Sequence, residues 1–382
     1  MTTHRVVLDA GGQAPLLPAA REAFLAALDE GWADPRRLHS EGRRARALLD
    51  GAREAIAAAV GARTEEVDLA PSHTAALQTA VSTVALGRRR VGADVVVSAV
   101  ERAAVLHAAD FAAARGGGSR VTVGVDRTGR VDDEAFAAAV TAPGVALAAL
   151  QHANGEVGTL QPVEAAHAAA RAAGVPLLVD AGASLGHVAV GGAWDVLAAN
   201  PADWGSPAGI GVLVTRAGVR RSPDRPSDED RWFPGGVAVP AALAAAVGLE
   251  AALADRDAAD AERRALVGRL RERVPQDVPD VDVAGPDGPR LPHVLTFSLL
   301  YVDGEAIVTA LDEAGFAVGS GSACTSSTLE PSHVLAAMGV LTHGNVRIAL
   351  ARGTSAEDVE RFADTLPPLV GRIRAALGAT NL

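Results

Sequence analysis

The residue with the clearest chemical potential is the single cysteine of the chain, Cys324. It lies in the run GSGSACTSSTLEPSHVL, whose glycines and serines favour a loop over a helix or a buried strand. A lone cysteine is usually a small buried apolar residue, but a thiol on an exposed polar loop can ionise and exchange sulfur. We therefore predict that Cys324 is a catalytic, sulfur-carrying or redox-sensing thiol.

The second chemical feature is an absence. All 35 residues counted as lysine plus arginine are arginine, because the sequence contains no lysine. We attribute the origin of this bias to high-GC codon usage, which also fits the many alanines and glycines. Whatever its origin, the chain has no side-chain ε-amine with which to form a Schiff base.

Composition excludes several broad classes of protein. The chain has 382 residues, which is long enough for two domains. Its formal net charge of −11 repels the phosphates of nucleic acids. One cysteine cannot form an intrachain disulfide, and the opening MTTHRVVLDAGG lacks the features of a secretory signal. No long apolar run suggests a membrane span. We expect a cytoplasmic protein with no nucleic acid or membrane partner.

Short apolar runs alternate with longer alanine-rich amphipathic segments, the βαβ pattern that is typical of a parallel sheet. Such sheets usually bind ligands at the carboxyl ends of their strands. The predicted strands are residues 94–98, 120–125, 145–151, 176–180 and 211–215. The predicted helices are residues 19–28, 42–60, 74–86, 104–115, 132–140 and 162–173.

A segment rich in proline, serine and charge, residues 220–231, predicts an exposed loop before a second region. We expect a large α/β domain over residues 16–240. We expect residues 1–15 and 241–382 to form a small α+β domain that carries the Cys324 loop.

Several runs resemble the cysteine desulfurases, which belong to the aminotransferase class V group of pyridoxal-phosphate (PLP) enzymes. They occur in family order along nearly the whole chain. The resemblance implies a type I PLP-dependent transferase fold, with a large domain built on a mainly parallel seven-stranded sheet flanked by helices, and usually a homodimer. The matching runs are RVVLDAGGQAPLLP, ADPRRLHSEGRRAR, HANGEVGTLQP, VDAGASLGH, PAGIGVLVTR, GSACTSSTLEPSHVLAAMGV and NVRIALARGTSAEDV.

The resemblance assigns roles to four residues. Asp180 matches the aspartate that pairs with the pyridine nitrogen, and Asn154 the asparagine near the phenolic oxygen. Thr74 matches the phosphate-side threonine at a helix start, and Arg347 the arginine that holds the substrate carboxylate. Each has a structural alternative: a turn cap for Asp180, an Asx-turn for Asn154, a helix cap for Thr74 and a surface ion pair for Arg347.

Other positions depart from the family pattern where the chemistry takes place. The family's Schiff-base lysine falls at Asp203 and its preceding histidine at Ala202, in the run ANPADWGSPAGIG. The histidine that stacks on the cofactor is replaced by Arg102, the glutamine beside the phenolic oxygen by Ala183, and a phosphate-side polar residue by Gly236. An internal aldimine with PLP is therefore impossible through any side chain, whereas non-covalent binding of PLP or pyridoxamine phosphate stays open.

Three functional hypotheses follow. In the first, the chain carries sulfur as a persulfide on Cys324, with a donor or acceptor protein as partner, and lacks lysine-dependent PLP catalysis. In the second, it is an enzyme that binds the cofactor non-covalently through Asp180, Asn154, Thr74 and Arg102. In the third, it is a structural or regulatory homologue.

Two further features stay open or carry no role. The histidines, His73 among them, form no pair at metal-ligand spacing, so no metal is expected. Trp204, next to Asp203, either fills the volume of a missing cofactor or belongs to the core.

Overall fold

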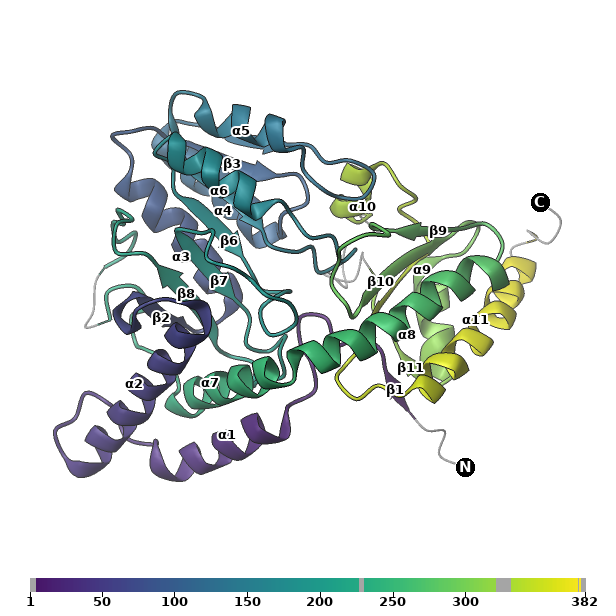
Figure 1. Cartoon of the computed structure of the whole chain (residues 1–382), viewed down its shortest axis with the longest axis horizontal. Helices are drawn as coiled ribbons and strands as arrows, with labels where there is room; N and C mark the ends of the chain where they lie inside the picture. The colour runs from purple at the N-terminus through teal and green to yellow at the C-terminus, as the bar shows by residue number, and fades with distance from the viewer. Residues whose placement is uncertain (1–4, 227–229, 321–330, 377, 379–382) are drawn as a thin grey trace.

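The structure, a computed structural model, describes residues 5–226, 230–320, 331–376 and 378. It consists of a larger unit around a seven-stranded sheet and a smaller unit around a three-stranded sheet (Figure 1). Among the described residues, no helix is long and apolar enough to cross a bilayer.

The large sheet has the strand order β2-β8-β7-β6-β5-β3-β4. Strands β4, β3, β5, β6 and β7 run parallel, while β8 is antiparallel to both β7 and β2. This confirms the predicted mainly parallel sheet. The strands are β2 (Val67–Ala70), β3 (Asp94–Ser98), β4 (Arg120–Val123), β5 (Val145–Gln151), β6 (Leu177–Asp180), β7 (Val196–Ala199) and β8 (Gly211–Thr215).

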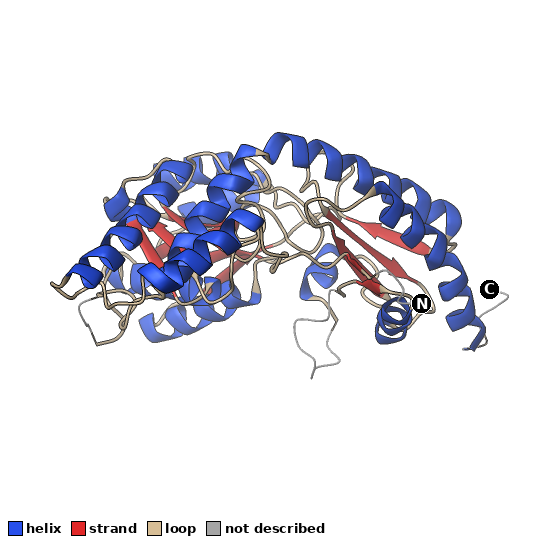
Figure 2. Cartoon of the chain, turned by 90° about the horizontal axis from the view of Figure 1, so that it is seen from below, coloured by secondary structure: helices blue, strands red, loops and turns tan. Residues whose placement is uncertain are grey.

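Helices cover both faces of this sheet (Figure 2), which explains why its central strands are continuous apolar runs. On β3, Val96 packs toward one layer of helices and Val95 and Val97 toward the other. The helices are α1 (Pro18–Glu30), α2 (Ser40–Val60), α3 (His73–Gly87), α4 (Ala103–Gly116), α5 (Asp133–Thr141), α6 (Val163–Ala172) and α7 (Val239–Ala254), with a 3₁₀ turn at Thr64–Glu66.

The small unit is built on an antiparallel sheet in the order β12-β10-β9. Strand β1 (Val6–Val7) pairs in parallel with β11 (Phe316–Ala317), so the start of the chain joins its C-terminal part. The other elements are α8 (Arg256–Asp277), β9 (Val281–Ala284), β10 (Val294–Leu299), α9 (Gly304–Glu313), α10 (His333–Met338), β12 (Asn345–Ala349) and α11 (Ala356–Ala376).

Helix α7 packs against α1 and α2, and its Val239, Ala242 and Leu249 are buried in the core of the large sheet. The next helix, α8, instead buries Leu266 and Leu270 in the core of the small unit. Figure 1 shows the two helices end to end between the units. The change from the core of the large sheet to that of the small unit therefore falls near residue 255, because α7 packs on the large sheet and α8 on the small one.

Candidate active site

The carboxyl ends of the parallel strands bring together the buried polar groups of the large unit. Asp180 is the last residue of β6, while Glu101, Asn154 and Asp203 follow β3, β5 and β7. All four are at least nine-tenths buried. This is the edge at which open α/β sheets bind ligands, as the sequence predicted.

Asp180 already has two partners within the chain. The backbone N–H of Gly182 donates to Asp180 Oδ1 at 2.8 Å, and His73 Nε2 lies 2.9 Å from the same oxygen. Burial would raise the pKa of Asp180, but the charges of His73 and Arg102 and the bond from Gly182 hold it below its usual value. The aspartate is therefore an ionised, buried carboxylate that faces a histidine ring.

Asp203, at the expected lysine position, is 2% exposed. Its Oδ1 accepts a hydrogen bond of 2.6 Å from the backbone N–H of Gly12. Its Oδ2 has no hydrogen-bond partner among the described residues and lies 3.7 Å from His187 Nε2. Burial raises the pKa of Asp203 to about 6, against the opposing effects of the Gly12 bond and of Arg102.

The two arginines expected at the site play different parts. Arg347, on β12, donates from Nη2 to Asp9 Oδ1 at 3.0 Å, so the structure contains an ion pair of Arg347. Its buried Nε has no hydrogen-bond partner among the described residues. Arg102 is exposed and directly precedes α4. Its positive charge lowers the pKa of both Asp180 and Asp203.

Asn154 forms an Asx-turn, because its Oδ1 accepts from the backbone N–H groups of Glu156 at 2.8 Å and Val157 at 2.9 Å. Its Nδ2 donates to the carbonyl of Val100 at 3.2 Å. Thr74 is exposed in the first turn of α3, and the residue that caps this helix is Ser72, not Thr74.

Two glutamates at this edge, the buried Glu101 and the partly buried Glu156, were not singled out from the sequence. Glu101 accepts from the backbone N–H of Gln151 at 2.8 Å, and burial together with the charge of Asp180 raises its pKa to about 8. Burial raises the pKa of Glu156 to about 7, although Arg347 opposes this. The edge thus carries carboxyl groups with widely different proton affinities.

The comparisons with known proteins agree with this geometry. A family model described as aminotransferase class-V matches residues 6–362. A cysteine desulfurase of Cereibacter sphaeroides is 35% identical over 380 residues, covering 97% of each chain. The chain belongs to the cysteine desulfurase family of class-V aminotransferases.

Other relatives support the same assignment. The cysteine desulfurase NifS of Azotobacter vinelandii is 33% identical over 365 residues, covering 92% of this chain and 89% of that protein. A solved NifS-like protein matches with a TM-score of 0.89 at 23% identity, over 96% of this chain and all of the other. The apo structure of a cysteine desulfurase from Thermococcus onnurineus NA1 matches with a TM-score of 0.83 at 21% identity. The expected family and fold are confirmed.

Membership of the cysteine desulfurase family supports PLP as the cofactor, but the residues at the strand ends fit it poorly. The pocket offers the carboxylate of Asp203 in place of an amine, and Asp180 already faces the ring of His73. The amine that would bind the cofactor is missing, and the aspartate that would pair with it lies against His73. The residues present therefore do not fit PLP.

The remaining predictions of the sequence have mixed outcomes in this cysteine desulfurase homologue. Cys324 lies outside the described residues. Trp204 is a core residue, 1% exposed, whose indole N–H donates to the carbonyl of Ala245 at 3.2 Å. Gly236 is exposed and lines a pocket beside α1, to which we return below. The described residues contain no group of three candidate metal ligands.

His73 is a further site residue to which the sequence assigned no role. One signal was available: it directly precedes Thr74, which the resemblance places beside the cofactor phosphate. Only the register of α3 against β6, however, shows that the ring faces Asp180.

Proposed function

We propose that this member of the cysteine desulfurase family carries sulfur as a persulfide on Cys324 and lacks lysine-dependent PLP catalysis. The observation that carries the proposal is a chain without lysine, in which the resemblance puts the buried Asp203 at the family's lysine position. A carboxylate cannot condense with an aldehyde, and no other side chain supplies the amine.

The proposed step needs only a thiol. The Cys324 thiolate attacks the outer sulfur of a donor persulfide, a new S–S bond forms, and the donor's S–S bond breaks. The donor leaves as a thiolate and Cys324 becomes a persulfide, so the exchange needs no external oxidant or reductant. A thiol acceptor then takes the sulfur in the same way.

The test is labelling with a persulfide donor. Purified protein is incubated with glutathione persulfide that carries labelled outer sulfur, and the Cys324 peptide is analysed by mass spectrometry. We expect label on the wild-type peptide that is passed to an added thiol, and none on Cys324→Ala. A wild-type thiol that stays unlabelled would refute the sulfur-carrier function and leave a structural or regulatory homologue.

The second candidate is a non-covalent PLP or pyridoxamine phosphate enzyme. The observation in its favour is that Asp180 and Asn154 lie at one edge of the sheet with the start of α3, which carries Thr74. The engaged state of Asp180 and the Asx-turn of Asn154 count against it.

We also propose that the chain forms a homodimer through a surface on α1 and the segment after it. Large apolar side chains are exposed there, and an apolar surface of this kind is typical of an interface. Because cysteine desulfurase relatives match nearly the whole chain, a second copy is the occupant that we propose. These side chains, the α1 patch, are Leu16, Leu25, Leu28, Trp32 and Leu38, with Trp32 69% and Leu38 87% exposed.

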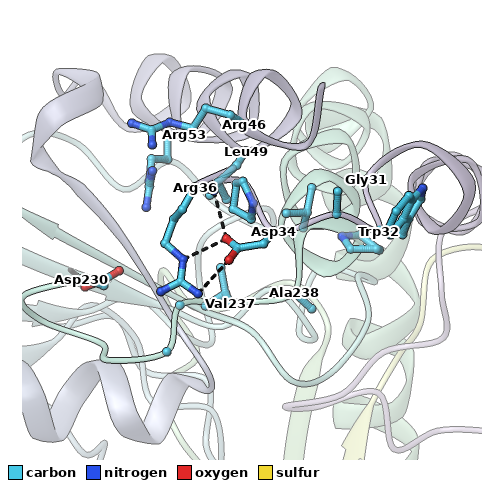
Figure 3. Close-up of a pocket in the computed structure, with 16 residues that line it drawn as sticks. Gly31, Trp32, Asp34, Arg36, Arg46, Leu49, Arg53, Asp230, Val237 and Ala238 are labelled. Carbon is cyan, nitrogen blue, oxygen red and sulfur yellow. Dashed lines mark hydrogen bonds and ion pairs between the residues drawn. The ribbon is translucent and has the colours of Figure 1, made fainter. Parts of the chain in front are cut away.

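A pocket of about 730 Å³ adjoins the α1 patch (Figure 3). Its wall includes Trp32, the arginines Arg46 and Arg53 of α2, and Gly236. Arg36 donates to both oxygens of Asp34, at 2.8 and 2.9 Å. The α1 patch and the pocket together therefore combine apolar side chains with charged groups, as the centre and rim of a protein interface do.

A further inference from the structure

The place at which this chain differs most sharply from a cofactor-binding site is the partner of Asp180. In the resembling family this aspartate pairs with the pyridine nitrogen of the cofactor. Here a ring nitrogen of the chain itself, His73 Nε2, lies 2.9 Å from Asp180 Oδ1. An aromatic nitrogen therefore lies beside the aspartate without any cofactor, although neither ring nitrogen of His73 makes a hydrogen bond with the described residues.

His73 is fixed by its own element. It is the first residue of α3 and is 5% exposed, and Ser72 caps the helix by accepting from the Ala75 N–H at 3.1 Å. A Cβ on Gly211 of β8 would lie 2.4 Å from the Ser72 carbonyl carbon and 2.6 Å from the His73 nitrogen. Strand β8 thus packs closely against the backbone that carries the buried ring.

Gly182 leaves the space that the His73 ring occupies. A Cβ on Gly182 would lie 2.2 Å from His73 Cε1, which real Cβ atoms do not tolerate. The histidine ring therefore occupies space that exists only because residue 182 has no side chain. The same Gly182 donates its N–H to Asp180, so one residue supports both members of the pair.

The second difference lies at the next strand end. Asp203 places a buried carboxyl group where the family has its amine, and Gly12 holds it there by a 2.6 Å hydrogen bond. The electrostatic influence of His73 and of Arg102 reaches both Asp180 and Asp203, so the two aspartates share one site.

We propose that His73 takes the place of the cofactor's pyridine nitrogen and closes this site to non-covalent binding of PLP and of pyridoxamine phosphate, while Asp203 prevents covalent attachment of PLP. The proposal rests on the proposed function and deepens it. Loss of the lysine alone prevents covalent attachment, whereas His73 also prevents non-covalent binding.

Two ligands distinguish the effect of His73 from that of Asp203. Pyridoxamine phosphate carries its own amine and needs no lysine, so its binding depends on His73 alone. Equilibrium dialysis of this ligand is compared for the wild type, His73→Ala, His73→Ser and the matched control His107→Ala, an exposed histidine on α4. Circular dichroism checks that each variant is folded.

We expect no binding by the wild type or by His107→Ala. We expect a folded His73→Ala or His73→Ser variant to bind pyridoxamine phosphate at least about tenfold more tightly than the wild type does. This factor corresponds to 1.4 kcal/mol of binding free energy. Binding by the wild type as tight as by the variants would overturn the proposal, as would folded His73 variants that do not bind.

A second arm uses PLP followed by borohydride reduction. Asp203→Lys alone should gain no adduct at residue 203, whereas the double variant with His73→Ala should gain one that peptide mass spectrometry locates. Equal trapping by both variants would contradict the role of His73.

Two outcomes distinguish this inference from the proposed function. Wild-type binding of pyridoxamine phosphate without alanine formation from cysteine would refute this inference alone. PLP-dependent alanine formation would refute the proposed function as well.

Discussion

At the scale of single residues, buried carboxyl groups dominate the site. The influence of His73 and Arg102 and the hydrogen bond from Gly182 keep the pKa of Asp180 lowered, while burial raises the pKa of Glu101 to about 8 and of Asp203 to about 6. At neutral pH this edge of the sheet therefore holds an ionised carboxyl group, Asp180, and a protonated one, Glu101. Such separation often marks catalytic sites, and Glu101 Oε2, Glu156 Oε1 and Asp203 Oδ2 are buried without a hydrogen-bond partner among the described residues.

Asp203→Asn should stabilise the fold in a pH-dependent way. The ordinary pKa of Asp203 is 3.8 and its folded pKa about 6, so the folded state holds its proton more tightly and ionisation costs stability as pH rises between these values. The amide keeps an acceptor for the Gly12 N–H. We expect a gain of about 1 to 3 kcal/mol in the free energy of unfolding at pH 8, shrinking toward pH 4.

Urea denaturation of both proteins at pH 4, 5, 6 and 8 measures this effect. The matched control is Asp257→Asn, since the Asp257 side chain is 92% exposed. A gain that is independent of pH, or that the control reproduces, would contradict the burial of an ionisable Asp203.

At the scale of elements, the approach of β8 to the start of α3 positions the site. Gly211→Ala should destabilise the fold by about 1 to 3 kcal/mol, the usual cost of overpacking, because its Cβ would meet backbone atoms of Ser72 and His73. Gly218→Ala is the control, since a Cβ there meets nothing within 4 Å. Denaturant unfolding of the two variants gives the comparison, and equal stabilities would refute the close approach.

Most of the elements could be predicted from the sequence. The strands Asp94–Ser98, Val145–Gln151 and Gly211–Thr215 match the prediction residue for residue, because each is a continuous apolar run bounded by turn residues. Strands β2 and β7 were missed. They are short, four residues each, and their pairing in the sheet, not their sequence, defines them.

The site was less predictable than the elements. Family resemblance placed Asp180 at the end of a strand, as the structure has it, but no strand was predicted before Asp203, which follows β7. The partners of these residues could not be predicted, because the His73 contact joins residues 107 positions apart and depends on a glycine between them in space. The change of core near residue 255 could not be predicted, because only the packing shows that the apolar α7 covers the large sheet while the charged α8 covers the small unit.

At the scale of the whole molecule, the α1 patch predicts a dimer. Trp32→Glu combined with Leu38→Glu should convert the protein to a monomer, since two charges would replace the most exposed apolar side chains of the patch. Light scattering after size exclusion measures the mass. Val91→Glu, at an exposed apolar residue elsewhere, is the control. A double variant that keeps the dimer mass would rule out this surface.

The absence of lysine concerns the whole molecule as well, since it removes every side-chain amine at once. The most direct measurement is alanine formation from L-cysteine by the purified wild-type chain, with and without added PLP. A cysteine desulfurase such as that of Azotobacter vinelandii serves as the positive control. We predict no increase in alanine on adding PLP, beyond that of PLP and cysteine without protein. Sustained PLP-dependent alanine formation by the wild-type chain would contradict this account.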